Sequence, residues 1–215
     1  MAAPNISTHD PIRVVSTTSG SQESIQNYLE AASQTFKGGT PVELNGSGNV
    51  IAWDGTTVLR AILGICLVGG FNYATAGAGA SPDFGSIGFP GGTPTFGTVQ
   101  NQPSAVNLVH GALFATGLTI VAQAIADTIF EAQVDASSGT TFNATSALVG
   151  TQLGLTVDTN GFWYADLAKV TVGTNTVITV RSLDPLDLVA GSVTTQINNG
   201  HIRFTFNQSA TQIQA

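Results

Sequence analysis

The chain has 215 residues, of which 42% are hydrophobic and only 9% are charged, against about 25% charged in ordinary soluble domains. This composition excludes intrinsic disorder, because disordered chains combine low hydrophobicity with high net charge. Thirteen acidic and six basic residues give a net charge of −7. There is no cluster of Lys or Arg in the sequence, so we expect no nucleic-acid partner.

The N-terminal residues 1–21 contain prolines and isolated apolar side chains without a helical period, which predicts an extended N-terminal arm. An extended segment can add a strand to the sheet edge of a neighbouring chain. We expect the arm to make such contacts through Pro4, Ile6, Pro11, Ile12 and Val14. The first residues lack a basic region followed by an apolar stretch, so we expect no secretory leader and synthesis in the cytoplasm.

The next segment, residues 22–68, is expected to form a helix followed by a small β unit. Ile25, Tyr28 and Leu29 have helical spacing and predict one short amphipathic helix that ends before Gly38. The period then falls to two, and residues 41–53 predict a strand, an Asn-Gly turn and a second strand. The apolar run 61–68 predicts a third strand.

Residues 69–102 form a long stretch rich in glycine and proline. A connection of this length is usually functional or disordered. It carries aromatic side chains at intervals, which predicts a loop packed on a surface, either of its own subunit or of a neighbouring chain. The candidate contact residues in this loop are Phe71, Tyr73, Phe84, Phe89 and Phe96.

The longest uncharged stretch lies between Asp83 and Asp127, and residues 105–126 within it approach the length of a bilayer span. Polar residues such as Asn107 and Gln123 interrupt this stretch, and much of its apolar content is alanine, which inserts weakly. We therefore expect a buried core segment or a subunit interface, and no membrane association.

Residues 103–215 are expected to form the main β domain, with one helical turn at 145–150. Alternating or continuous apolar patterns predict strands at 117–125, 128–135, 154–157, 161–165, 175–182 and 201–207. The predicted class is mainly β, a β-sandwich or barrel with one or two short helices and an extended N-terminal arm.

The sequence contains no motif for catalysis or metal binding. His9, His110 and His201 are isolated, without the spacing of a zinc site, and the single cysteine, Cys66, lies in an apolar run typical of a buried thiol. A Gly-x-Ser-x-Gly elbow is absent, and the calcium-loop-like Asp158-Thr-Asn-Gly is followed by aromatic residues. We expect no catalytic residues, no metal, no cofactor and no enzymatic activity.

Several stretches resemble tailed-bacteriophage capsid decoration, or cement, proteins. They are residues 36–55 with the following Ile62-Leu-Gly-Ile, and residues 127–134, 154–166, 177–185 and 200–207. The resemblance implies a β-rich protein, frequently a homotrimer, that is located on the capsid exterior of a virion, binds the major capsid protein and braces neighbouring capsomers. It implies no catalytic residues. Residues 69–102 match no feature of that family.

Two alternatives to capsid decoration are left open by the residues. One is another phage structural component, from the tail, fibre or neck. The other is a carbohydrate-binding β-sandwich module that stacks a sugar on Trp53, or on Trp163 with Tyr164, although aromatic residues beside a hairpin turn are more often part of a core.

Overall fold

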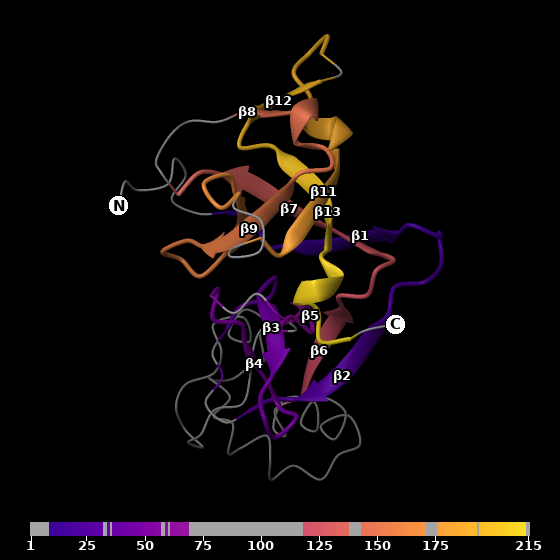
Figure 1. Ribbon diagram of the computed structural model, residues 1–215, viewed down its shortest axis with the longest axis vertical. Coiled ribbons are helices and arrows are strands. Elements are labelled where there is room, and N and C mark those ends of the chain that lie inside the picture. The colour runs from indigo at the N-terminus through magenta and orange to yellow at the C-terminus, as the bar shows by residue number, and fades with distance from the viewer. Residues whose placement is uncertain are drawn as a thin grey trace, which may run out of the picture.

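The computed structural model describes residues 9–31, 34, 36–56, 59, 61–68, 118–137, 143–170, 176–192 and 194–213. This part of the chain contains strands β1 to β13 and three short 3-10 helices, η1 to η3 (Figure 1). The predicted mainly β class is therefore confirmed.

Five strands of the C-terminal half close into a barrel. They are β7 (Thr128–Asp135), β9 (Gln152–Val157), β10 (Trp163–Asp166), β11 (Ile178–Leu183) and β13 (His201–Phe206). The order along the sheet is β7-β10-β9-β11-β13, and β13 pairs back onto β7, which closes the ring. The long strand β7 also pairs with β1 (Arg13–Thr17), antiparallel, with Arg13 opposite Glu131. We call this unit the C-terminal barrel.

A second sheet lies below the C-terminal barrel in Figure 1. Its strands are β2 (Ile25–Leu29), β3 (Pro41–Leu44), β4 (Val50–Ala52), β5 (Gly64–Cys66) and β6 (Leu118–Gln123). The order is β2-β6-β5-β3-β4, and a parallel bridge between Glu30 and Val50 brings the two outer strands together. We call this unit the small barrel.

The remaining elements are short. β8 (Asn143–Thr145) and β12 (Thr195–Asn198) pair at the end of the molecule remote from the small barrel (Figure 1). The 3-10 helices are η1 (Ser146–Leu148), η2 (Pro185–Asp187) and η3 (Gln208–Ala210). The helical turn predicted at 145–150 is confirmed by η1.

The two barrels share one hydrophobic core. Phe130 and Phe206 pack edge to face at 5.2 Å between ring centroids in the C-terminal barrel, a favourable arrangement of aromatic rings. The same cluster of buried residues includes Ile62 and Ile65 of the small barrel. A smaller cluster fills the small barrel itself, from Val42, Val50, Leu63, Cys66 and Val121. The described residues therefore form one continuous packed unit.

The helix predicted between Ser21 and Gly38 is wrong, because the structure has strand β2 at Ile25–Leu29. Tyr28 packs towards the core of the small barrel, whereas Ile25 and Leu29 are exposed. A short apolar pattern of this kind fits both the helical period and the strand period. Pairing with β6 supplies the backbone hydrogen bonds that favour the strand.

The division of the chain at residue 103 also needs correction, because β6 belongs to the small barrel and not to the C-terminal one. β6 lies between β2 and β5, so the small barrel is completed by residues that follow the long connection. Gly64 permits the close approach of β5 to β6, since a Cβ there would lie 2.0 Å from the carbonyl oxygen of Ala122.

Candidate interaction surfaces

The N-terminal segment from His9 onwards is built into the fold of its own chain. It is extended, as predicted, but the strand that pairs with it is β7 of the same chain. Ile12 is 2% exposed in the shared core, and Val14 packs against that core. The expectation that Ile12 contacts another chain is therefore corrected, whereas Val14 is only partly buried. Pro11 is exposed and lies against Gly39, where a Cβ would come within 2.7 Å of it.

His9 anchors this segment through a buried polar cluster. Its ring Nδ1 lies 3.1 Å from the Asp158 carboxylate and its Nε2 lies 3.3 Å from the Asp135 carboxylate, with all three side chains fully buried. Each ring nitrogen of His9 therefore has a carboxylate oxygen as its hydrogen-bond partner. The backbone N–H of His9 donates to Asp158 as well, at 2.9 Å. Four backbone and ring contacts of one residue, including a stack on Tyr164, hold the segment before β1 on the C-terminal barrel.

Asp158 is held in its ionised form by the hairpin turn between β9 and β10. Burial raises the pKa of the Asp158 carboxyl, but hydrogen bonds from the backbone of Phe162 and His9, from the His9 ring and from the backbone of Asn160 outweigh burial and lower that pKa. The N–H groups of Asn160 and Phe162 lie 2.8 and 2.9 Å from one carboxylate oxygen. The motif that resembled a calcium loop is thus a turn closed by its own backbone.

A second polar cluster lies across β1, β7 and β13. Arg13 donates to Glu131 through Nε at 2.8 Å, and Arg203 lies 3.4 Å from the other oxygen of Glu131. Arg203 also reaches Asp184, at 3.2 Å. Glu131 is 2% exposed, so the two guanidinium groups neutralise a carboxylate that would otherwise be costly to bury.

His201 extends this second cluster towards the surface. Its Nδ1 lies 2.6 Å from Asp187 and its Nε2 lies 3.3 Å from Asp10. Ligand atoms of Glu131, Asp184 and His201 come within 4.8 Å of one another, which is the spacing of a metal site. Both oxygens of Glu131 are already in contact with arginine, so the residues present fit an ion-pair network better than a cation site.

Sequence patterns did not identify either cluster. The partners of His9 lie 126 and 149 residues further along the chain, so no local motif joins them. His110 lies outside the described residues. The one part of these clusters that a sequence pattern indicated was the turn that follows Asp158.

Basic side chains are engaged inside the molecule. Each Lys and Arg that the structure describes contacts a group of its own chain: Arg13 and Arg203 with Glu131, Lys37 with the Phe162 ring, Lys169 with the Leu155 carbonyl and Arg181 with the Thr205 hydroxyl. Within the described ranges, every lysine and arginine therefore has an internal contact.

The tryptophans are core residues. Trp53 is 2% exposed, Trp163 is 6% exposed, and their ring centroids lie 5.2 Å apart between the two barrels. Tyr164 is 1% exposed beneath His9. None of the three offers an open ring face for a sugar, so the stacking platform considered from the sequence is not formed.

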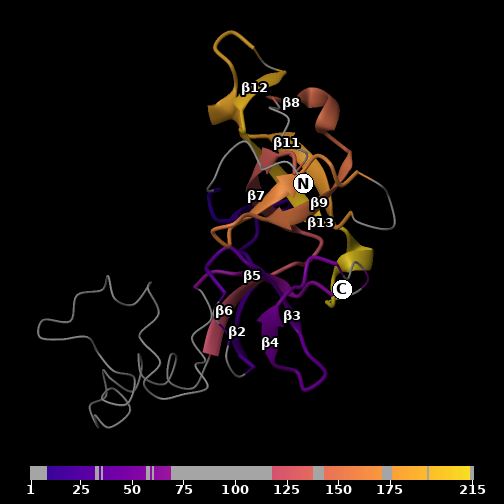
Figure 2. The same ribbon diagram turned by 90° about the vertical axis from the view of Figure 1, so that its left-hand side faces the viewer.

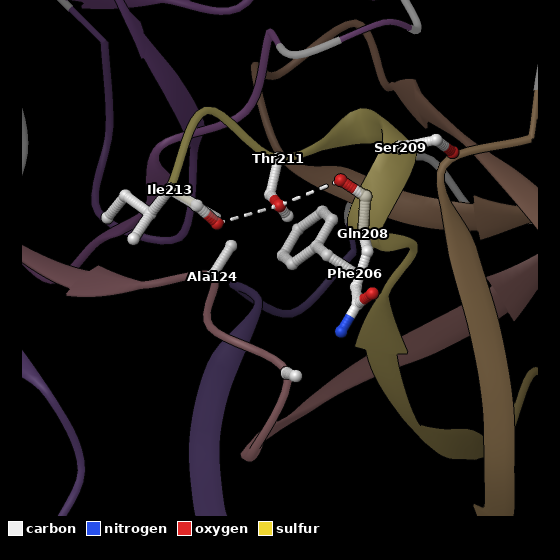
Figure 3. Close-up of a pocket in the computed structure, with 7 residues that line it drawn as sticks. Ala124, Phe206, Gln208, Ser209, Thr211 and Ile213 are labelled. Carbon is white, nitrogen blue, oxygen red and sulfur yellow. Dashed lines mark hydrogen bonds between the residues drawn. The ribbon is translucent and has the colours of Figure 1, made fainter. Parts of the chain in front are cut away.

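The described surface includes a smaller and a larger hollow. The smaller one, about 220 Å³, lies where β6 leaves the small barrel and η3 follows β13 (Figure 3). The Thr211 hydroxyl lies 3.1 Å from the carbonyl oxygens of both Gln208 and Ile213, so its polar group is already used. The larger one, about 550 Å³, is an open groove beside the β9–β10 hairpin that contains Lys37. Neither brings together an acid, a base and a nucleophile.

Exposed apolar side chains occur at both ends of the molecule, and also elsewhere, at Leu59, Leu67, Val157 and Val170. Around β8 and β12 they are Val149, Leu186 and Val189, with exposed fractions of 47%, 88% and 40%. On β2, at the opposite end, Ile25 and Leu29 are each 48% exposed. Figure 2 shows the β8–β12 pair and the small barrel at opposite ends of the long axis.

The other predicted contact residues cannot be placed in this arrangement. Pro4 and Ile6 lie outside the described residues, as do all five aromatic residues of the 69–102 loop.

Comparisons with known proteins identify no relative of this chain. No family model matches the chain, and neither the curated proteins nor the solved structures contain a significant match to it. Among the helices of the described residues, none has the length and hydropathy needed to cross a membrane.

Proposed function

We propose that this protein is a non-enzymatic structural component of a phage virion that binds the outer surface of the capsid and cements neighbouring capsomers. Its partner in this role is the major capsid protein. The resemblance of several sequence stretches to capsid decoration proteins supports this function. It also implies a homotrimer, which we include in the proposal.

The observation that carries the proposal is the distribution of charged and apolar side chains. The described basic groups are used in internal contacts, and acidic groups are buried against internal partners, Glu131 against arginine and Asp135 and Asp158 against His9. Apolar side chains are exposed instead at both ends of the molecule, at Leu186 and at Ile25 for example. Permanent interfaces are more apolar than ordinary surfaces, and two contact regions at opposite ends suit a protein that joins neighbours.

The test is sedimentation of the purified protein with undecorated, expanded phage heads, followed by heating of the heads. We expect stoichiometric co-sedimentation and a higher temperature of head rupture. Protein that stays in the supernatant at all ratios would overturn the proposal. Sedimentation with isolated tails instead would identify the alternative structural role, and retention on a glycan column would favour a binding module.

A pair of variants locates the head contact. Leu186→Lys places a charge on the most exposed apolar side chain of the β8–β12 end, and we expect weaker binding to heads because that charge must be desolvated. Val157→Lys makes the same change at a 45% exposed valine in the middle of the molecule and serves as the control. Equal binding by both variants would exclude the β8–β12 end as the contact.

A further inference from the structure

Two peptide bonds of this chain join an aspartate to a proline, Asp10–Pro11 and Asp184–Pro185. The bond before a proline is a tertiary amide, so its nitrogen leaves as a secondary amine when the bond breaks. The side-chain carboxyl group of the preceding aspartate can attack its own main-chain carbonyl carbon, because the two groups are close enough to close a small ring. The structure surrounds the two bonds differently.

The Asp10 carboxylate lies beside the imidazole ring of His201. Oδ2 of Asp10 is 3.3 Å from Nε2 of that ring. On the opposite side of the ring, Nδ1 lies 2.6 Å from Oδ2 of Asp187, and the backbone N–H of His201 donates to the same oxygen at 2.6 Å. These two contacts orient the ring and turn Nε2 towards Asp10. Asp187, His201 and Asp10 thus form a row of a carboxylate, an imidazole and a second carboxylate.

The Asp10–Pro11 bond is held between anchored residues. His9, which precedes it, is fixed in the buried polar cluster, and the backbone N–H of Asp10 donates to Gln133 at 2.7 Å. Ile12, which follows it, is 2% exposed in the shared core. Holding the reacting groups in place lowers the entropy that a reaction between them must lose. The side chain of Asp10 is 70% exposed, so water also reaches this position.

The Asp184–Pro185 bond lacks these conditions. The Asp184 side chain is 4% exposed. Its Oδ1 accepts hydrogen bonds from the Leu186 N–H and from Arg203, each at 3.2 Å, and Asp184 caps the helix η2 that Pro185 begins. This carboxylate is therefore engaged in structural contacts and shielded from water.

We propose that the chain cleaves its own Asp10–Pro11 bond, with the Asp10 carboxylate as nucleophile and His201 as proton donor, while Asp187 positions the ring. Oδ1 of Asp10 attacks the main-chain carbonyl carbon of Asp10 and closes a cyclic anhydride. The C–N bond to Pro11 breaks, its electron pair stays on the nitrogen, and this nitrogen takes a proton from Nε2 of His201. Water then opens the anhydride, which leaves two carboxyl groups on Asp10.

Four carboxylates surround the proton donor. Besides Asp10 and Asp187, Glu131 and Asp184 have an oxygen within 4.8 Å of a ring nitrogen of His201. Glu131 and Asp184 are both in contact with arginine. Asp10 therefore differs from these two in having its carboxylate on the histidine and next to a proline.

Self-cleavage goes beyond the proposed structural role and is compatible with it. The reaction occurs once in each chain and acts on no external substrate, so it does not make the protein an enzyme. Its products are residues 1–10 and a chain that begins at Pro11. Binding to heads tests the structural role, whereas cleavage is measured on the protein alone, so failure of either proposal can be distinguished from failure of the other.

The first test records masses of the full chain under denaturing conditions after incubation in mildly acidic buffer, where a histidine can carry the proton. One sample stays folded and a second is kept in urea, where both Asp–Pro bonds are solvated alike. We expect the Asp10–Pro11 bond to break about 100-fold faster in the folded chain than in urea, the effect of a positioned proton donor. The Asp184–Pro185 bond should stay intact in the folded chain. An Asp10–Pro11 bond that breaks no faster when folded would overturn the proposal.

The second test assigns the roles with variants whose folding is checked by circular dichroism. Asp10→Ala removes the nucleophile and should abolish cleavage. His201→Ala should slow it by about 100-fold. Imidazole added to the buffer should restore part of that rate, which it could not do for a merely structural defect, and should not rescue Asp10→Ala. Asp187→Asn should slow cleavage less, and the control Ser47→Ala should keep the wild-type rate. A wild-type rate in His201→Ala would show that the histidine is not the proton donor, and a wild-type rate in Asp187→Asn would contradict its positioning role.

Discussion

The imidazole ring of His9 stacks on the phenol ring of Tyr164, with 4.1 Å between the ring centroids and 13° between the planes. Burial, together with the carboxylates of Asp166, Asp135 and Asp158, raises the pKa of the Tyr164 hydroxyl, so this ring stays neutral beneath the histidine. The stack and the two carboxylates around His9 join β7, β9 and β10 to the segment that leads into β1. A single side chain therefore ties the segment before β1 to three strands of the C-terminal barrel.

Replacing His9 tests how much this cluster stabilises the fold. His9→Ala removes the ring that contacts two buried carboxylates and leaves a cavity beside Tyr164, and we expect a loss of about 3 kcal/mol in the free energy of unfolding. His9→Phe retains the stack on Tyr164 and should be less destabilising than alanine. Urea unfolding at neutral pH measures both changes.

His201→Ala is the matched control for His9. His201 also lies between two carboxylates, but its side chain is 19% exposed and one partner, Asp10, is 70% exposed. Solvent screens such a pair, and we expect a loss of about 1 kcal/mol or less. Equal losses at the two histidines would contradict the role assigned to burial.

The Asp127 carboxyl provides a pH-dependent contribution to stability. Hydrogen bonds from the hydroxyls of Ser19 and Thr18 are the main causes that lower its pKa to about 2. The pKa is below that of the unfolded chain, about 3.9, so this stabilisation is complete above about pH 4 and is lost as the pH falls through about 2. We expect Ser19→Ala to raise the Asp127 pKa, measured by NMR titration. Ser47→Ala, in an exposed turn, should leave it unchanged.

The close contact between β5 and β6 makes Gly64 sensitive to substitution. A Cβ at this position would lie 2.0 Å from the Ala122 carbonyl oxygen and 2.9 Å from a methyl group of Val121. Neither strand can move without disturbing the small-barrel core, so we expect Gly64→Ala to cost about 3 kcal/mol or more. Gly46→Ala, where a Cβ meets nothing within 4 Å, should change stability by less than about 0.5 kcal/mol. Thermal unfolding of the two variants is the comparison.

Cys66 is expected to be unreactive in the folded protein. Burial raises the pKa of its thiol to about 11, against the effect of the Thr119 hydroxyl 2.9 Å away. The thiolate is the reactive form, so labelling by a disulfide reagent at pH 8 should proceed only as the small barrel opens. Its rate should rise with urea concentration. A Ser47→Cys variant, exposed in the β3–β4 turn, should be labelled at once at the added site.

The sequence by itself determined which segments form strands wherever the apolar pattern fits the period of a strand and not the period of a helix. Residues 128–135 combine apolar residues with β-branched ones and form β7 with the predicted bounds. The hairpin at 41–53 was predicted because an Asn-Gly turn separates two short alternating runs, and β3 and β4 confirm it. These features depend on local backbone preference and on the period of burial, which a sequence carries directly.

The tertiary structure alone decided how the strands pair. β2 fits a helical pattern until β6 supplies its hydrogen bonds, and β6 itself comes from beyond the long connection. The same holds for His9, whose hydrogen-bond partners are brought to it by β7 and by the β9–β10 turn. Which backbone groups of β2 face β6 could be defined only from the pairing of Ser24 with Gln123. A periodic pattern indicates which faces are buried, but the partner on each edge depends on contacts between residues far apart in the chain.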